Sequence, residues 1–221
     1  MNCAGGISVD IDWYGHSCFR LREGGVTIVT DPFDKSIGLP PPRLRADVVT
    51  ISHDAPGHAN AGAVKGAKVI SRPGEYEIKE VFITGLQTWR GAGAHGEAKE
   101  ENTVFVFECA ELVVCHLGDL ARGLSQAQVE SLPSVDVLLV PVGAGSALDA
   151  DKASEMISLL EPSVVIPMHY QLPGLTVELD PLTKFLKVMG VTDPATQDSL
   201  RVAKSSLPDE MQVVVLECKQ S

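Results

Sequence analysis

Five residues that could ligate a metal ion stand at or just after the ends of apolar segments typical of β-strands. A lone histidine at a strand end is more often a structural residue, but four in equivalent places are hard to attribute to coincidence. Strands that end together in a sandwich would bring such side chains to one edge. Imidazole and carboxylate groups are ligands that a catalytic zinc-type site prefers. The five candidates are His53, His58, His116, Asp119 and His169.

The elements that must position these residues change character along the chain. The first half alternates apolar strands with glycine-containing turns, including a predicted hairpin over 17–30 and another over 103–116. The second half alternates strands with helices, which are predicted to begin near Ser125, Asp149 and Asp180, the last with Pro181 in its first turn. This order predicts an α/β (α+β) fold with two β-sheets and helices packed outside. No repeat or long linker divides the sequence, so we expect one domain over 1–221.

Composition excludes several classes of partner. The formal charge of −11 repels phosphate backbones, so nucleic acid is not expected as a partner. No apolar run approaches the ~20 residues that a membrane span needs, and no secretory signal is recognisable. The expected location is therefore the cytoplasm, with no membrane partner. Five cysteines without a C-x-x-C pair argue against a disulfide framework.

Several motifs resemble one known family. The stretch His53-Asp54-Ala55-Pro56-Gly57-His58 would become His-x-His-x-Asp-His, a dinuclear metal motif, with a histidine at position 55 and an aspartate at position 57. The chain resembles the ascorbate-phosphate-lactonase-like branch of the metallo-β-lactamase superfamily, whose fold is an αββα four-layer sandwich of two mixed sheets. The other motifs that carry the resemblance are 13–17, 28–32, 116–119 and 166–170.

The resemblance also implies a set of site residues. His53 and His116 would ligate the first metal, His58 and His169 the second, and Asp119 would bridge the two. Asp119 and His116 would then be the catalytic residues. Residues near the site but outside the ligand set would be His16, Asp54 and Tyr170.

Two ligand positions of the family motif are empty in this chain, since neither Ala55 nor Gly57 has a donor side chain. We therefore expect a weakened centre with one Zn or Mn ion, or none, instead of two. Restoring the residues as Ala55→His with Gly57→Asp is expected to raise the metal content.

The implied activity is hydrolysis of a small ester, lactone or phosphoester by a metal-bound hydroxide. The alternative is a catalytically inactive member of the fold that binds a small ligand or a protein partner. The sequence leaves the substrate and a homo-oligomeric state open. A rival nucleotide-binding interpretation of Gly143-x-Gly145 is weak, because Leu148 occupies the third glycine position of that fingerprint.

Overall fold

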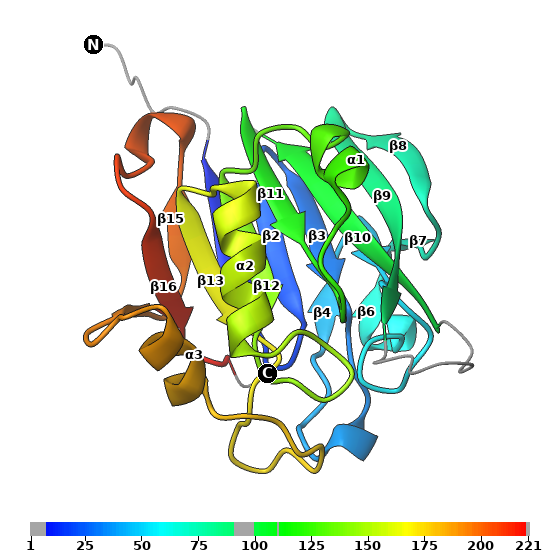
Figure 1. The fold of residues 1–221 in the computed structure, drawn as a ribbon. Helices are drawn as coiled ribbons and strands as arrows, with labels where there is room; N and C mark the ends of the chain where they lie inside the picture. The colour runs from blue at the N-terminus through cyan, green and yellow to red at the C-terminus, as the bar shows by residue number, and fades with distance from the viewer. Residues whose placement is uncertain (1–7, 91–99, 110, 220–221) are drawn as a thin grey trace.

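Two mixed β-sheets packed face to face form the body of the protein (Figure 1). The computed structural model describes residues 8–90, 100–109 and 111–219. Within these residues, no helix is long and apolar enough to cross a bilayer. The predicted sandwich of two mixed sheets is confirmed.

The first sheet has six strands, and its predicted hairpin over 17–30 is confirmed. The turn of this hairpin uses Gly24 and Gly25, both with positive φ. The first four strands of the sheet are antiparallel, and β5 and β7 then extend it in parallel to β3. The strands, in spatial order, are β15 (Leu200–Val202), β1 (Val9–Trp13), β2 (Phe19–Glu23), β3 (Val26–Thr30), β5 (Val48–Thr50) and β7 (Lys68–Ile70).

The second sheet has eight strands and includes the predicted hairpin over 103–116. Its strands are parallel from β14 to β11 and antiparallel from β11 to β8. In spatial order they are β14 (Ala195–Gln197), β16 (Gln212–Leu216), β13 (Val164–Met168), β12 (Val137–Pro141), β11 (Leu112–His116), β10 (Glu100–Cys109), β9 (Val81–Arg90) and β8 (Gly74–Ile78).

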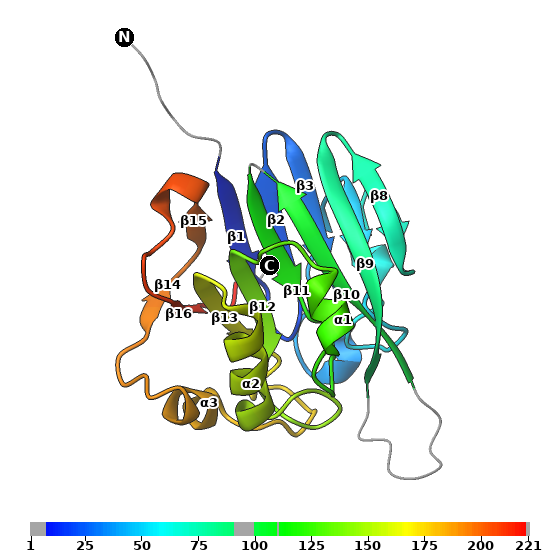
Figure 2. The same ribbon diagram turned by 45° about the horizontal axis from the view of Figure 1, so that its top comes forward.

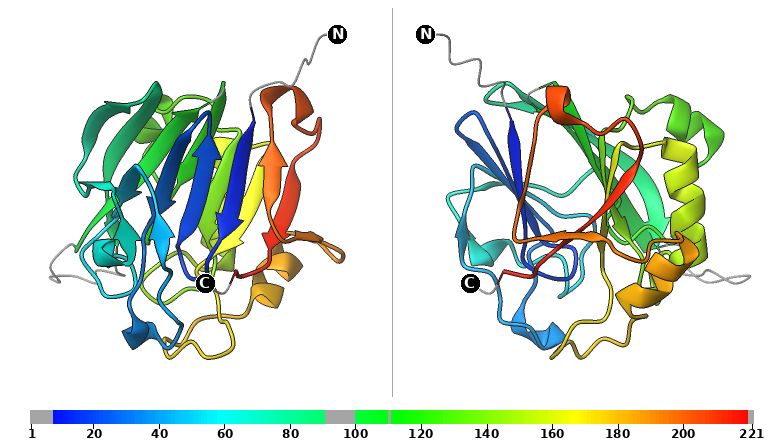
Figure 3. Two further views of the ribbon diagram at one scale, coloured as in Figure 1. Left: turned by 180° about the vertical axis from the view of Figure 1, so that it is seen from behind. Right: turned by 90° about the vertical axis from the view of Figure 1, so that its left-hand side faces the viewer.

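The described residues form three α-helices, α1 (Gln126–Glu130), α2 (Ala150–Leu160) and α3 (Leu182–Val188). Of these, α1 and α2 lie on the outer side of the second sheet, and α3 packs against α2 (Figures 2 and 3). The predicted capping box at Ser125 and the predicted cap at Asp149 are confirmed. The predicted cap at Asp180 is wrong by one residue. Pro181 occupies the cap position, and the Asp180 carboxylate pairs instead with Lys184 Nζ at 2.6 Å.

Short irregular elements, and no α-helix among the described residues, cover the outer face of the first sheet. They are η1 (Lys35–Ile37), β4 (Leu44–Arg45), η2 (Ala61–Ala63) and β6 (Val64–Lys65). A further 3-10 turn, η3 (Lys204–Ser206), instead joins β15 of the first sheet to β16 of the second. On the outer face of the first sheet, Phe33, Ile37, Leu44 and Val64 pack in a second apolar cluster against Val49 of β5. These irregular elements hold the segments that carry His53 and His58 against the first sheet.

The main core lies between the sheets and includes Trp13, Phe19, Phe105 and Phe107, all at most 1% exposed. Strands β3 and β5 in one sheet and β11 and β13 in the other end near one another. The segments after these four strands carry Asp31, His53, His58, Asp119 and His169.

Candidate metal centre

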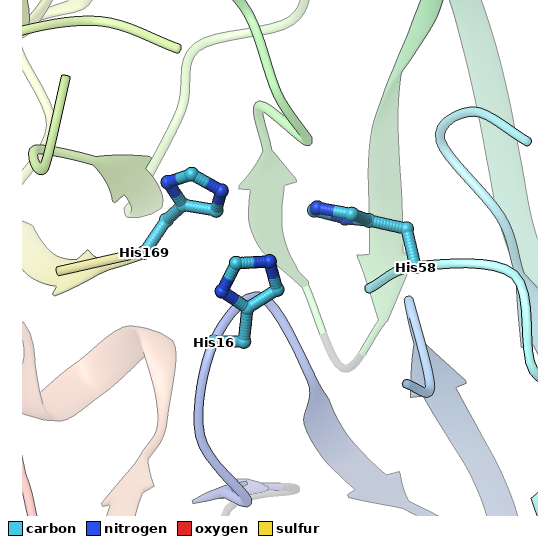
Figure 4. A group of neighbouring side chains, drawn as sticks. All are labelled: His16, His58 and His169. Atoms are coloured by element: carbon cyan, nitrogen blue, oxygen red, sulfur yellow. The ribbon is translucent and has the colours of Figure 1, made fainter. Parts of the chain in front are cut away.

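Three histidine rings meet where the ends of the two sheets face each other. His16 lies in the turn after β1, His58 in the loop after β5 and His169 directly after β13. One ligand-capable atom from each ring lies within 4.8 Å of those from the other two. Each ring turns a nitrogen toward its neighbours (Figure 4). The rings are buried, with centroid distances of 4.7, 4.2 and 5.7 Å for 16–58, 16–169 and 58–169. We call these residues the histidine cluster.

The backbone that carries two of these rings is in a rare conformation. His16 has φ +51° and His169 has φ +54°, the left-handed region that is unusual for residues with a side chain. The His16 carbonyl accepts hydrogen bonds from Trp13 Nε1 and from the His169 amide, both at 3.1 Å. These bonds tie the two segments together. Backbone strain of this kind persists where surrounding structure enforces it, and it often marks functional sites.

The Asp119 carboxylate lies beside the histidine cluster. Its Oδ1 lies 3.2 Å from His169 Nε2 yet has no hydrogen-bond partner among the described residues. Its Oδ2 accepts a hydrogen bond from Ser146 Oγ and lies 3.8 Å from His53 Nε2. Burial alone would raise the pKa of Asp119, but the imidazoles of His169, His58 and His53 and the Ser146 bond together lower it. The carboxylate is therefore ionised, and one of its oxygens is free toward the cluster.

Gly118 fixes the turn that presents Asp119. Its φ is +59°, and a Cβ there would lie 2.5 Å from Ser52 Cβ and 2.6 Å from Asn102 Oδ1. The buried Asn102 Oδ1 in turn accepts a hydrogen bond from the Asp119 amide at 2.9 Å. The turn thus packs directly between the two sheets, with no room for a side chain.

We expect Gly118→Ala to lower the free energy of unfolding by about 2–5 kcal/mol, from left-handed strain and overpacking together. Urea unfolding measures the change. Gly62→Ala is the control, because a Cβ at Gly62 would meet only Asn60 Oδ1 at an ordinary 3.6 Å. Equal stability of both variants would contradict the close packing at Gly118.

A buried carboxylate outside the predicted set, Asp31, determines how two of the histidines are protonated. Asp31 Oδ1 accepts from the Ser52 amide at 2.7 Å, and its Oδ2 accepts from Ser52 Oγ at 2.5 Å and from His58 Nδ1 at 2.8 Å. Because the Ser52 hydroxyl proton goes to Asp31, Ser52 Oγ accepts from His53 Nδ1 at 3.0 Å. Both histidines then carry their proton on Nδ1 and leave Nε2 as a lone pair.

These histidines are neutral in the folded protein. Burial lowers the pKa of His58 and of His53 to about 3. The Asp119 carboxylate opposes this shift for both rings, and Asp31 opposes it for His53, while the adjacent imidazoles and Arg90 add to it. Burial and the adjacent His169 and His58 also hold the pKa of His16 well below its ordinary value. Neutral imidazoles and an ionised carboxylate offer lone pairs to the space between them, which is the chemistry of a cation site.

Neutral buried histidines make stability depend on pH. His53 and His58 have folded-state pKa values of about 3 against an ordinary 6.5, so only the unfolded chain takes up protons between these values. Stability is therefore present above pH 6.5 and falls as the pH drops toward 3. We expect a loss on the order of 5 kcal/mol for each of the two histidines across this window. Urea unfolding of metal-free protein at pH 7.0 and 4.5 should show most of the slope, and His58→Gln should flatten it.

His116 does not join the centre, in contrast to its predicted role as ligand and catalytic residue. Its Nδ1 accepts from the Gly118 amide at 3.2 Å, and its Nε2 therefore donates to the Ser17 carbonyl at 2.9 Å. Both ring nitrogens are engaged by backbone, because the ring turns toward the first sheet. The side chain is fully buried there and links the two sheets.

The structure places the other predicted residues as follows. His16, predicted as a pocket residue outside the ligand set, belongs to the histidine cluster. Asp54 is exposed and lines a cleft beside the centre. Tyr170 is buried behind the cluster, with its ring centroid 5.2 Å from that of Trp13. His53 lies in the cleft wall, with its ring centroid 4.1 Å from that of His58.

The expected effect of Ala55→His with Gly57→Asp stays a prediction, and one contact in the structure argues against it at position 57. A Cβ at Gly57 would lie 2.9 Å from His16 Nε2 and 3.3 Å from His16 Cδ2. The His16 ring thus fills the space beside Gly57, and Gly57→Asp would displace a member of the cluster.

The loop that carried the rival nucleotide-binding interpretation packs on the centre instead. A Cβ at Gly143 would lie 2.1 Å from the His169 carbonyl oxygen, so this glycine permits close contact with the His169 backbone. Ser146, in the same loop, donates to Asp119. The glycines therefore serve the packing of the centre. No sequence pattern marked the roles of Ser146 or Ser52, whereas Asp31 was visible only as a strand end.

Comparisons with known proteins agree with the fold. A family model described as the beta-lactamase superfamily domain matches residues 10–169, which include the whole centre. A UPF0173 metal-dependent hydrolase from Methanopyrus kandleri is 24% identical over 191 residues, 72% of this chain and 83% of that protein. Another from Thermoplasma volcanium is 27% identical, covering 80% and 89%. A solved metallo-β-lactamase superfamily structure from Thermotoga maritima is 41% identical with a TM-score of 0.75, covering 94% and 98%.

The chain therefore belongs to the metallo-β-lactamase superfamily.

Proposed function

We propose that this protein is a metal-dependent hydrolase whose single metal ion is held by His16, His58 and His169, with Asp119 beside them. One observation carries the proposal. Asp119 Oδ1 is a buried, ionised oxygen that faces His169 and has no hydrogen-bond partner among the described residues. A buried carboxylate oxygen without a hydrogen-bond donor is costly, and a cation between this oxygen and the histidine nitrogens would remove the cost. Three histidines with a further open position are a common catalytic zinc set.

A zinc ion at this place would supply the Lewis acidity that activates water toward an ester, lactone or phosphoester. The residues of the chain prepare the site for it. The Asp31 hydrogen bond orients His58 so that Nε2 is free. The Ser146 hydroxyl and the Asn102 amide fix the Asp119 carboxylate and its turn. His53 presents an unprotonated Nε2 in the cleft wall, where it can accept a hydrogen bond from water or substrate.

The relatives named as metal-dependent hydrolases support this activity. Three features of the donor set support one ion over two: Ala55 has no ligand atom, Gly57 is packed against His16, and both nitrogens of His116 are bonded elsewhere. The second group of possible ligands, Asp31, His53 and His58, shares His58 with the histidine cluster. Imidazole-rich sites favour zinc over manganese. That the chain belongs to the lactonase-like branch, and that it hydrolyses an ester, lactone or phosphoester bond, are parts of this proposal.

The test is metal content by elemental mass spectrometry on protein purified without chelator, followed by dialysis against Zn²⁺ or Mn²⁺. Hydrolysis of ester, lactone and phosphodiester substrates is then measured with and without metal. We expect about one ion per chain and metal-stimulated turnover, both lost in His58→Ala. The control is Asp209→Asn, which makes the same change at an exposed carboxylate outside the cleft beside the centre.

Retained metal without turnover on any substrate would favour the alternative, an inactive member of the superfamily that binds a ligand or a partner. The absence of metal in every preparation would overturn the metal centre itself.

A further inference from the structure

A cleft of about 1110 Å³ opens beside the metal centre. One wall consists of residues after β5, including His53 and Asp54, and of the loop after β7. The opposite wall consists of β9 and β10. The loop after β7 lies directly on β9, because a Cβ at Gly85 would be only 3.0 Å from the Arg72 carbonyl oxygen and 3.1 Å from Pro73 Cα. This loop therefore closes one side of the cleft, and His53 is among the residues that line it.

Arg90, the last residue of β9, places a cation in this cleft next to the centre. Its side chain is only 19% exposed, and its Nε lies 3.6 Å from Asp119 Oδ2. The same Nε lies 3.1 Å from Glu100 Oε2 but is buried and donates no hydrogen bond among the described residues. The Arg90 guanidinium thus lies near two carboxylates, and its Nε–H still has no acceptor among the described residues. Arginine has five N–H groups in a fork that matches carboxylate and phosphate oxygens.

The charged side chains of the cleft differ in exposure. Asp54, Arg72, Glu100 and Glu101 are exposed, and the Glu100 side chain is 62% exposed. Solvent screens charges at such positions. Arg90 lies deeper, where screening is weaker and a charge-assisted hydrogen bond is stronger. A ligand that reaches the metal centre therefore meets a cation at depth, despite the acidic character of the chain.

We propose that Arg90 binds an anionic oxygen group of the substrate, a carboxylate or a phosphate, while the bond to be hydrolysed faces the histidine cluster. The substrate class is thus a small ester or lactone that carries a second, anionic group, or a phosphoester. The catalytic part of this inference rests on the proposed hydrolase function. The binding of the anion by Arg90 does not, and it can be measured without metal.

The experiment measures anion binding to metal-free protein by isothermal titration calorimetry, with phenyl phosphate and benzoate as the two probes. We expect at least one probe to bind, and Arg90→Gln to weaken it by about 10- to 100-fold. The matched control is Arg43→Gln, the same charge change at an exposed residue outside the cleft. Arg43→Gln should change binding by less than about threefold. The probe that binds more tightly identifies the preferred anion.

Failure of both probes to bind the parent protein, or equal effects of the two arginine variants, would overturn the proposal. Metal content and turnover of a neutral ester by the parent protein are measured in parallel. If the parent protein binds the anion but neither retains metal nor hydrolyses the ester, the hydrolase function is refuted and the anion site is supported. If it retains metal and hydrolyses the ester but does not bind the anion, the anion site is refuted and the hydrolase function is supported.

Discussion

His16→Ala is expected to weaken zinc binding by about a hundredfold and to abolish metal-stimulated hydrolysis, while the fold is retained. The reason is that a zinc affinity of roughly 10–16 kcal/mol shared among four ligands gives about 3 kcal/mol for each. His16 lies within the cluster by geometry, with its ring 4.2 Å from that of His169 and 4.7 Å from that of His58. Zinc affinity is measured by competition with a chelating dye, and the fold by near-ultraviolet circular dichroism.

The matched variant is His116→Gln, because the family pattern and the structure make opposite predictions for this pair. The pattern makes His116 a ligand and His16 a neighbour. The structure bonds both nitrogens of His116 to backbone and places His16 in the centre. We therefore expect folded His116→Gln to keep zinc affinity within about threefold of the parent, at some cost in stability. If folded His116→Gln failed to bind zinc and His16→Ala bound it with normal affinity, the histidine cluster would be refuted as the ligand set.

Much of the fold follows from local signals in the sequence. The Gly24-Gly25 turn, the capping box at Ser125 and the cap at Asp149 each depend on residues within a few positions, so both hairpins and two helix starts could be predicted. Strand β8 (Gly74–Ile78) could not, because it is an edge strand with no fully buried residue and therefore lacks an apolar alternation. The cap of α3 differs by one residue from the prediction, since the Asp180 carboxylate pairs with Lys184, four positions on in the helix, and does not cap its backbone.

The site was predictable in its location and less so in its ligands. His58, His169 and Asp119 follow strands, and strand ends can be read from apolar runs. The direction in which a histidine ring points cannot be read from these runs. His116 ends a strand like the others, but its Nε2 meets the Ser17 carbonyl, ninety-nine positions away in the chain. His16 and Asp31 have positive φ, which no residue type other than glycine announces in a sequence. The structure of the Gly57 contact also explains why a lost aspartate need not mean an empty centre, since the space beside it is filled by another potential ligand.

Asp31→Asn is expected to lower zinc affinity by about 10- to 100-fold without touching any atom of the histidine cluster except His58 Nδ1. The carboxylate accepts three hydrogen bonds, and an amide that keeps the Ser52 amide bond on its oxygen must present its NH₂ group to Ser52 Oγ and His58. His58 Nδ1 then becomes an acceptor, and its proton moves to Nε2, the atom that faces the cluster. The Ser52 hydroxyl, released from Asp31, can donate to His53 Nδ1, so that the His53 proton moves to Nε2 as well. One exchange of O for NH₂ thus removes two lone pairs from the site.

The control for this variant is Ser52→Ala, which removes the link to His53 but leaves the bond between Asp31 and His58. It should keep zinc affinity within a few-fold, because His53 is outside the cluster. Nitrogen-15 NMR of the imidazole groups in the metal-free proteins reports the tautomers directly. We expect the His58 proton on Nδ1 in the parent and in Ser52→Ala, and on Nε2 in Asp31→Asn. Asparagine adopts positive φ more readily than most residues, so the backbone at position 31, with φ +38°, should be preserved. Weak zinc binding with an unchanged His58 tautomer would show that Asp31 acts through the charge it places near the ion. In that case Asp31→Glu, which keeps the charge but not the geometry, should recover the affinity.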